Sequence, residues 1–128
     1  IADELLEDNA RTIVGPVISE RCKPELRNHT IETAGVLNKA GVPMCICTDH
    51  PVVPEQYLPL SAGLAVRGGL DRDEALKAIT IYPAQITGIA DRVGSIEPGK
   101  DADIVIFSGD PLSVCDTPDM VIVNGTVI

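Results

Sequence analysis

The chain has 128 residues, which is long enough for one ordinary domain with a hydrophobic core. Its 10 Lys and Arg residues stand against 19 Asp and Glu residues, and the net charge of -9 would repel phosphate backbones and anionic membrane surfaces. This charge argues against nucleic acid and membranes as partners. Pro, Gly or charged residues interrupt every apolar stretch well before the roughly 20 residues that a membrane helix needs, so we expect a soluble protein.

The four cysteines are Cys22, Cys45, Cys47 and Cys115. They form no Cys-x-x-Cys pair, and two of them fall in an apolar run, so we expect reduced thiols and a cytoplasmic location. The sequence does not open with Met. It begins inside an amphipathic helical pattern that extends to about residue 10, and we therefore expect it to be part of a longer protein.

The next segments predict a strand, a helix and a second strand. The β-branched run at 12–18 is typical of a strand. Thr30 can cap a helix that runs to Ala40, and Gly41 stands just past its end. A second apolar run follows at 42–48. This order predicts two neighbouring parallel strands with the helix crossing between them.

Two more helical segments are predicted downstream. Residues 57–67 have a helical pattern that Gly68 ends. Asp71 is a good N-cap for the next helix, and Glu74, three residues later, indicates a start that resembles a capping box. Pro83 interrupts this helix, so a separate short turn is expected at 83–86.

The last third of the sequence has a different character, with short apolar runs between Gly and Pro. Strands are expected at 104–107, 120–123 and 126–128. Asn124-Gly125 between the last two runs predicts a tight hairpin. The sequence therefore indicates an α/β part followed by a small β element, with the boundary between residues 88 and 94.

The clearest candidate for chemistry is Asp49, a single acid that follows the buried run 42–48. In barrels and open α/β sheets, functional groups gather at the carboxyl ends of the strands. Asp before a turn also commonly caps a loop or a helix, and position alone leaves these two interpretations even.

The two histidines are weaker candidates. His50 follows Asp49 and could contact a substrate or orient the acid, although a lone loop histidine is more often packed or solvated. His29 lies in a polar stretch before a predicted helix, which accounts for it without a ligand role. The sequence contains no glycine-rich phosphate loop, Gly-x-Ser-x-Gly elbow or His-Glu-x-x-His pair.

Several motifs together resemble the carboxy-terminal part of the amidohydrolase superfamily. The segment from Val93 to Val105, VGSIEPGKDADIV, is similar to the signature that closes many of these enzymes. Before it, Glu74 to Thr80 resembles the family's helix after the last barrel strand, and after it Val121 to Gly125 resembles the terminal hairpin. Thr48 to Pro51 falls where the family places an aspartate at the end of the eighth barrel strand. Imidazolonepropionase-like enzymes and related amidohydrolases are the most similar subfamilies.

This resemblance implies an α/β fold: the carboxy-terminal segment of a TIM (β/α)8 barrel, with its last two βα units, followed by part of a small β-sandwich domain. Residues 1–88 would form the barrel segment and residues 89–128 the β element. In the family, one or two divalent metal ions are held by a His-x-His pair, later histidines and this aspartate. Asp49 would therefore be both metal ligand and catalytic proton acceptor, with Zn²⁺ as the expected metal and His50 as a substrate-binding residue.

One departure from the family pattern limits what this chain can do. It has only two histidines and no His-x-His pair, whereas catalytic zinc normally has three protein ligands. We therefore expect a carboxy-terminal fragment of a metal-dependent hydrolase of amide or cyclic amide bonds, inactive and metal-free by itself. It should associate with itself or with the rest of its parent chain. The alternative is a stand-alone binding or structural module without catalysis.

Overall fold

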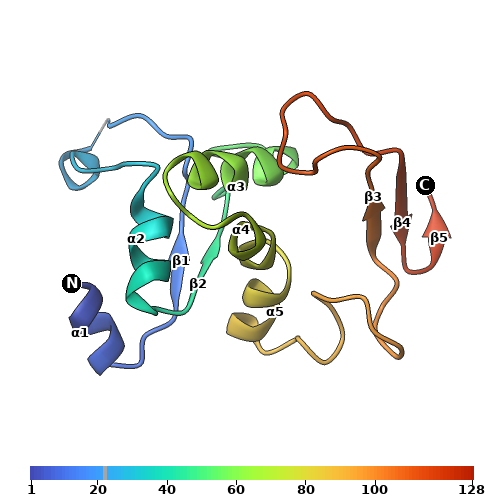
Figure 1. The fold of residues 1–128 in the computed structure, drawn as a ribbon, viewed down its shortest axis with the longest axis horizontal. Helices are drawn as coiled ribbons and strands as arrows, with labels where there is room; N and C mark the ends of the chain where they lie inside the picture. The colour runs from blue at the N-terminus through green and yellow to red at the C-terminus, as the bar shows by residue number, and fades with distance from the viewer. Residues whose placement is uncertain (22) are drawn as a thin grey trace.

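The computed structural model describes residues 1–21 and 23–128, so the expectation of a reduced thiol at Cys22 lies outside the described residues. The first part of the chain contains α1 (Ala2–Glu7), β1 (Thr12–Val14), α2 (Thr33–Ala40) and β2 (Met44–Ile46). A 3-10 turn, η1, lies between β1 and α2 (Figure 1). Its bounds are Pro24–Leu26.

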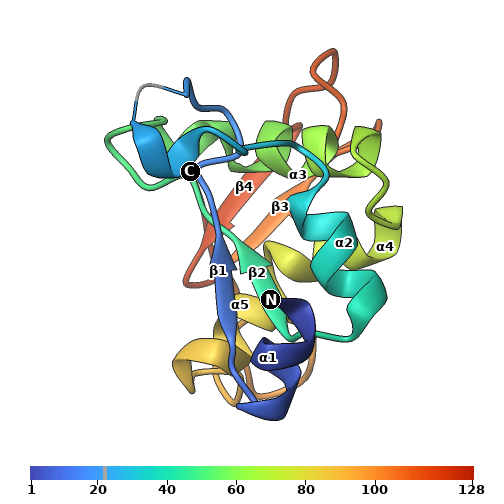
Figure 2. The same ribbon diagram turned by 90° about the vertical axis from the view of Figure 1, so that its left-hand side faces the viewer.

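The strands β1 and β2 pair in parallel, as the sequence predicted. Thr12 is opposite Met44 and Val14 is opposite Ile46, and α2 lies beside the pair in Figure 2. Both strands are shorter than expected. β1 ends shortly before Pro16, which has no backbone N–H to donate to a neighbouring strand. β2 ends shortly before the turn that contains Asp49.

Helix α2 begins two residues later than predicted, with Glu32 instead of Thr30 at the N-cap position. Thr30 forms the turn before the helix, since its hydroxyl oxygen accepts the N–H of Glu32 at 3.3 Å and its carbonyl accepts the hydroxyl of Thr33 at 3.1 Å. The predicted end is confirmed. Gly41 has a φ of 84°, the left-handed conformation that glycine adopts without strain.

Three helices and a 3-10 turn follow β2. These elements are η2 (Glu55–Tyr57), α3 (Leu58–Arg67), α4 (Arg72–Ala78) and α5 (Ile81–Thr87). The separate segment expected at 83–86 is therefore part of a seven-residue helix with Pro in its first turn. No helix in the described residues has the length and apolar character that a membrane crossing requires.

Asp71 caps α4 as predicted. Its Oδ1 accepts the backbone N–H groups of Asp73 and Glu74 at 2.9 and 3.2 Å. The capping box is incomplete, because the carboxylate of Glu74 turns toward other helices instead of back to Asp71.

The last third of the chain forms a small antiparallel sheet in the order β3-β4-β5. Its strands are β3 (Ile104–Ile106), β4 (Met120–Val123) and β5 (Thr126–Val127). Asn124 and Gly125 have φ values of 49° and 77°, which is the pair of left-handed residues that a two-residue type I′ hairpin requires. The predicted hairpin is confirmed.

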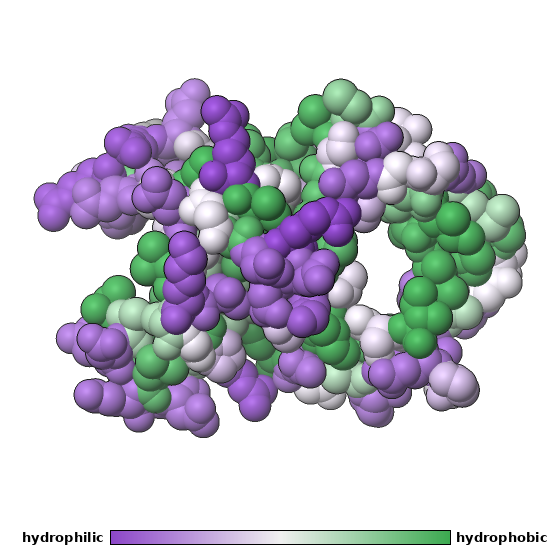
Figure 3. All heavy atoms as spheres, in the orientation of Figure 1, coloured by the Kyte–Doolittle hydropathy of each residue, from purple (hydrophilic) through white to green (hydrophobic). Residues whose placement is uncertain are grey.

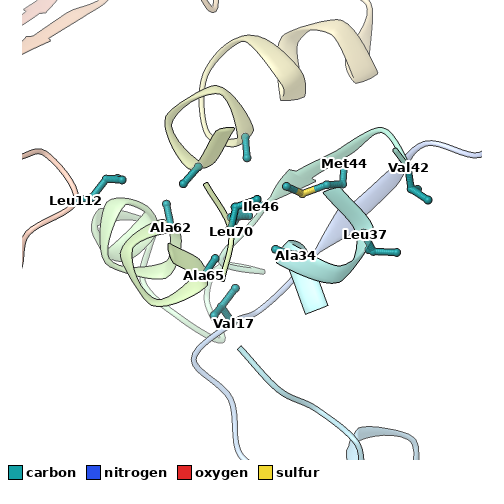
Figure 4. Close-up of a cluster of buried hydrophobic side chains, with 12 residues drawn as sticks. Val17, Ala34, Leu37, Val42, Met44, Ile46, Ala62, Ala65, Leu70 and Leu112 are labelled. Carbon is teal, nitrogen blue, oxygen red and sulfur yellow. The ribbon is translucent and has the colours of Figure 1, made fainter. Parts of the chain in front are cut away.

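The hydrophobic core lies where α2, α3 and α4 cover one face of β2 (Figure 4). All three residues of β2 are buried. The side chains at the centre of the core are small or aliphatic and include Ala34, Leu37, Met44, Ile46, Ala62, Ala65, Leu70 and Ala75. Alanines let the helices approach closely, which accounts for a core almost without aromatic residues.

The small sheet is attached to the helices at its two ends. At one end Leu112 is buried against α3, where a Cβ on Gly63 would lie 2.5 Å from the Leu112 carbonyl oxygen, and Arg72 forms an ion pair of 2.6 Å with Asp110. At the other end Gly94 packs on α5. Figure 3 shows an opening between these two attachments, with apolar residues concentrated on the sheet side.

A polar network ties α2, α4 and α5 together around the Glu74 carboxylate. It accepts the Lys77 ammonium at 2.8 Å, the Tyr82 hydroxyl at 2.7 Å and the Asn38 amide at 3.2 Å. The hydrogen bond from Lys77 does most to hold the pKa of Glu74 below its usual range, and the hydrogen bond from Tyr82 comes next. The hydrogen bond between Tyr82 and Glu74 also raises the pKa of the Tyr82 hydroxyl. The network therefore favours the ionised carboxylate in the folded state.

Glu74→Gln should lower the free energy of unfolding by about 1 to 2 kcal/mol at neutral pH, because hydrogen bonds to a charged group are lost. A carboxyl whose pKa is lowered by folding stabilises the protein above its unfolded pKa of about 4.3, and this stabilisation is lost as the pH falls through the folded pKa. The difference between wild type and variant in urea unfolding should therefore shrink below about pH 4.3.

The matched control is Glu25→Gln, at an exposed carboxylate in η1. It should change the free energy of unfolding by less than about 0.5 kcal/mol at every pH. A pH-independent effect of Glu74→Gln would contradict the role of its charge.

Candidate active site

The candidate site lies at the carboxyl end of β2, on the edge of the parallel pair. The backbone ladder extends one residue beyond β2, since Cys47 N–H donates to the Val14 carbonyl at 2.9 Å. Thr48 is still buried, and Asp49 is the first exposed residue after the strand. The chain therefore passes from the core to the surface between Thr48 and Asp49.

A tight turn fixes the backbone of Asp49. Its carbonyl accepts the N–H of Val52 at 2.9 Å, and Val53 is buried just beyond. Asp49 itself has a φ of 55°, in the left-handed region that Asp and Asn adopt more readily than other residues with a side chain. The residue type at this position is thus constrained by the backbone as well as by any chemistry.

Several aspartates of the chain bind backbone N–H groups, and among the described residues the Asp49 carboxylate does not. Asp71 accepts two backbone N–H groups, Asp103 accepts the N–H of Asn124 at 2.7 Å, and Asp110 accepts that of Leu112 at 2.9 Å. Within residues 1–21 and 23–128, Asp49 forms no such bond and no ion pair. Among the described residues, the Asp49 carboxylate therefore caps no helix or turn, and it is exposed to solvent.

The structure places the two histidines differently. His50 is exposed beside Asp49, within the same turn. His29 is half-buried in the loop before α2, where its Nε2 donates to the Pro16 carbonyl at 2.9 Å and its own carbonyl accepts the guanidinium of Arg21. His29 thus joins the loops that follow β1 and precede α2.

The described residues do not form a metal cage. No three His, Cys, Asp or Glu side chains among them come together in a way that could hold a metal ion. Asp49 offers one carboxylate, and catalytic zinc takes three protein ligands. By themselves, these residues do not fit a catalytic metal.

A hollow of about 490 Å³ lies at the opposite, amino end of β2, where it is lined by residues such as Arg11, Asn38, Met44, Glu74 and Tyr82. Its polar wall includes the Glu74 network, whose carboxylate already has three donors. Functional groups of parallel sheets gather at the carboxyl ends of the strands, so this hollow is not the candidate site.

One close contact near Asp49 was not predicted from the sequence. Gly15 follows β1 and lies against Cys47, two residues before the acid. A Gly-Pro pair predicts a turn in any sequence, and nothing in it indicates which residue of the partner strand it faces. In the sequence, this contact is therefore indicated only by the presence of a glycine at position 15.

Comparison with known proteins gives a consistent result. The family model described as "Amidohydrolase family" matches residues 4–128. The amidohydrolase tasK of Hapsidospora irregularis is 35% identical over 104 residues, which are 81% of this chain and 11% of that protein. The imidazolonepropionase of Geobacillus kaustophilus is 47% identical over 72 residues, 54% of this chain and 17% of that protein. The chain thus spans a small fraction of the length of these relatives.

The fold is also found in a solved structure. The crystal structure of an amidohydrolase from Thermotoga maritima matches 99% of this chain with a TM-score of 0.94 and 39% sequence identity, and the match covers 33% of that protein. Both the helical part and the small sheet are therefore arranged as in a known enzyme structure.

The left-handed backbone of Asp49 predicts how substitutions there affect stability. Asp49→Asn and Asp49→Gly should leave the free energy of unfolding within about 0.5 kcal/mol of wild type. Asp49→Val should lower it by about 1 to 2 kcal/mol, because a β-branched residue is strained at this φ. Chemical denaturation measures both effects.

Asp91→Val is the matched control, since Asp91 is also exposed and is absent from the positive-φ residues. It should be nearly neutral. Equal losses at positions 49 and 91 would show that charge removal or β-branching alone accounts for the effect.

Proposed function

This chain belongs to the amidohydrolase family, and on that premise we propose that it supplies a catalytic residue to a hydrolase of carbon–nitrogen bonds. The observation that supports the proposal is the free, exposed carboxylate of Asp49 at the carboxyl end of a buried parallel strand. The substrate class is a small amide or cyclic amide, in line with relatives named amidohydrolase and imidazolonepropionase.

In this proposal Asp49 is the group that moves the proton. Its carboxylate accepts a proton from the water that attacks the amide carbon and passes it to the leaving nitrogen. An exposed carboxylate without competing intramolecular bonds has its lone pairs available for this transfer. The hydrogen bond from the Val52 N–H to the Asp49 carbonyl fixes the backbone of Asp49 during this transfer.

Asp49 would also contribute one ligand to a divalent metal ion, with zinc as the expected metal. A bound zinc ion supplies an activated water at neutral pH. The other ligands would have to come from polypeptide outside the described residues, because these residues do not form a cage. The chemistry assigned to this chain is therefore confined to Asp49 and its neighbours.

His50 is proposed to contact the substrate. It is exposed next to Asp49, and its ring can donate or accept a hydrogen bond. Such a contact orients the amide but does not transfer the proton. Loss of His50 should therefore reduce the rate less than loss of Asp49.

The fold supports two structural parts along the chain. Residues 1–88 would form the last two βα units of a (β/α)8 barrel, and residues 89–128 would form part of a small β-sandwich. The parallel pair β1 and β2, with α2 between them in sequence, is the repeating unit of such a barrel. The antiparallel sheet β3-β4-β5 is one layer, which needs a second layer to bury its apolar side chains.

The exposed apolar residues support association with further polypeptide. Ile13 on β1 is 60% exposed, and Val105 and Val127 on the small sheet are 51% and 60% exposed. Isolated proteins rarely leave strands of this kind uncovered, because edges and apolar faces pair with other chains. The covering polypeptide would be the remainder of the parent protein or a second copy.

The decisive experiment is Asp49→Asn in the full-length protein. Asn keeps the shape and the left-handed backbone but cannot accept the proton, so kcat should fall by about 10²- to 10⁴-fold. Hydrolysis is measured on a panel of small linear and cyclic amides. His50→Ala should reduce kcat/KM by a smaller factor, mainly through KM.

Asp91→Asn serves as the control, since it removes an exposed carboxylate outside the proposed site. It should retain wild-type kinetics. Full activity of the Asp49→Asn protein would refute the assignment of Asp49.

The isolated 128-residue chain should self-associate and hold no stoichiometric zinc. Sedimentation velocity should show species that grow with concentration, because apolar strand faces are uncovered, and elemental analysis should find substoichiometric metal. A compact monomer at all concentrations would contradict the proposed association, and one zinc per chain would contradict the incomplete ligand set.

A further inference from the structure

The carboxyl ends of β1 and β2 meet at a close contact. Val14 accepts the N–H of Cys47 at 2.9 Å, and the next residue of the first strand, Gly15, lies against Cys47 itself. A Cβ added to Gly15 would lie 2.7 Å from Cys47 Sγ and 3.0 Å from the Cys47 carbonyl carbon, and closer still to the carbonyl oxygen. Real Cβ atoms essentially never approach other atoms so closely.

The requirement at Gly15 is one of space. Its φ is outside the left-handed region, so no positive φ calls for a glycine here. The obstacle is mainly a main-chain carbonyl, which cannot rotate away as the end of a long side chain can. A larger residue would have to displace the backbone of Cys47.

Displacement of Cys47 would reach Asp49, two residues further along. Thr48 between them is buried, and the turn after Asp49 is closed by its bond to Val52. This segment therefore has little freedom to absorb a shift before the acid. A misplacement of about 1 Å in a catalytic group can cost about 10²-fold in rate.

We propose that Gly15 is a positioning residue for Asp49, because its missing side chain lets the end of β2 approach β1 and so sets the place of the carboxylate. This inference rests on the proposed catalytic role of Asp49. It adds to that role a residue from the other strand, which touches neither substrate nor metal.

The test compares two glycine substitutions in the full-length protein. Gly15→Ala should lower kcat by about 10- to 100-fold, change KM less, and shift the pH profile of kcat/KM, since the proton acceptor is moved. Gly41→Ala is the matched control at the other end of β2. A Cβ there has no atom within 4 Å but the φ is 84°, so this variant should lower Tm and leave kcat and the pH profile unchanged.

A substitution on the second strand covers the case in which Gly15→Ala fails to fold. Cys47→Val places an extra methyl group beside Gly15 and should lower kcat about tenfold, whereas Cys47→Ala should keep wild-type kcat. In the double variant Gly15→Ala/Cys47→Ala the carbonyl contact remains, so kcat should stay low. Recovery of wild-type kcat in this double variant would overturn the backbone contact as the cause.

The outcomes also separate this inference from the proposed function. If Asp49→Asn is inactive but the folded Gly15→Ala and Cys47→Val proteins have wild-type kcat, the positioning role is wrong and the catalytic role stands. If Asp49→Asn is active, the proposed function itself fails. Equal loss of kcat in Gly15→Ala and Gly41→Ala would attribute the effect to general destabilisation and would also overturn the inference.

Discussion

The parallel pairing of β1 with β2 is the constraint on which the rest of this structure depends. Two backbone bonds of 2.9 Å, from Thr12 to Pro43 and from Cys47 to Val14, fix the register at the two ends of the pair. A slip of one residue would reverse the side chains of β2 and take Met44 and Ile46 out of the core. The register therefore determines both what the helices pack against and where Asp49 emerges.

Polar groups divide between the two ends of β2. Near the amino end, the Glu74 carboxylate has three donors and holds α2, α4 and α5 together. At the carboxyl end, Asp49 has no such partner among the described residues and lies exposed. A satisfied, partly buried network stabilises a fold, whereas a carboxylate that must bind or react has to keep its lone pairs free. The polar network that stabilises the fold and the carboxylate proposed for chemistry thus lie at opposite ends of one strand.

Features that depend on a few neighbouring residues could be predicted from the sequence. The stop at Gly41, the cap at Asp71 and the hairpin at Asn124-Gly125 each follow from local backbone chemistry, and the exposed position of Asp49 follows from its place after a buried run. Contacts between distant segments could not be predicted. The partners of Glu74 come from three helices, and the contact of Gly15 joins two strands, so neither has a local signature.

The two strands also differ in the side chains that directly follow them. A site at the carboxyl edge of parallel strands is assembled from the loops that follow each strand. Directly after β1 the chain continues as Gly15, Pro16, Val17 and Ile18, none of which can ligate a metal or transfer a proton through its side chain, and the titratable residues of this loop come later. After β2 it offers Asp49 and His50. The residues that directly follow β1 therefore contribute space, and those that directly follow β2 contribute a carboxylate and an imidazole. Under the proposed function, the affinity for a metal would be set mainly by groups from other strands.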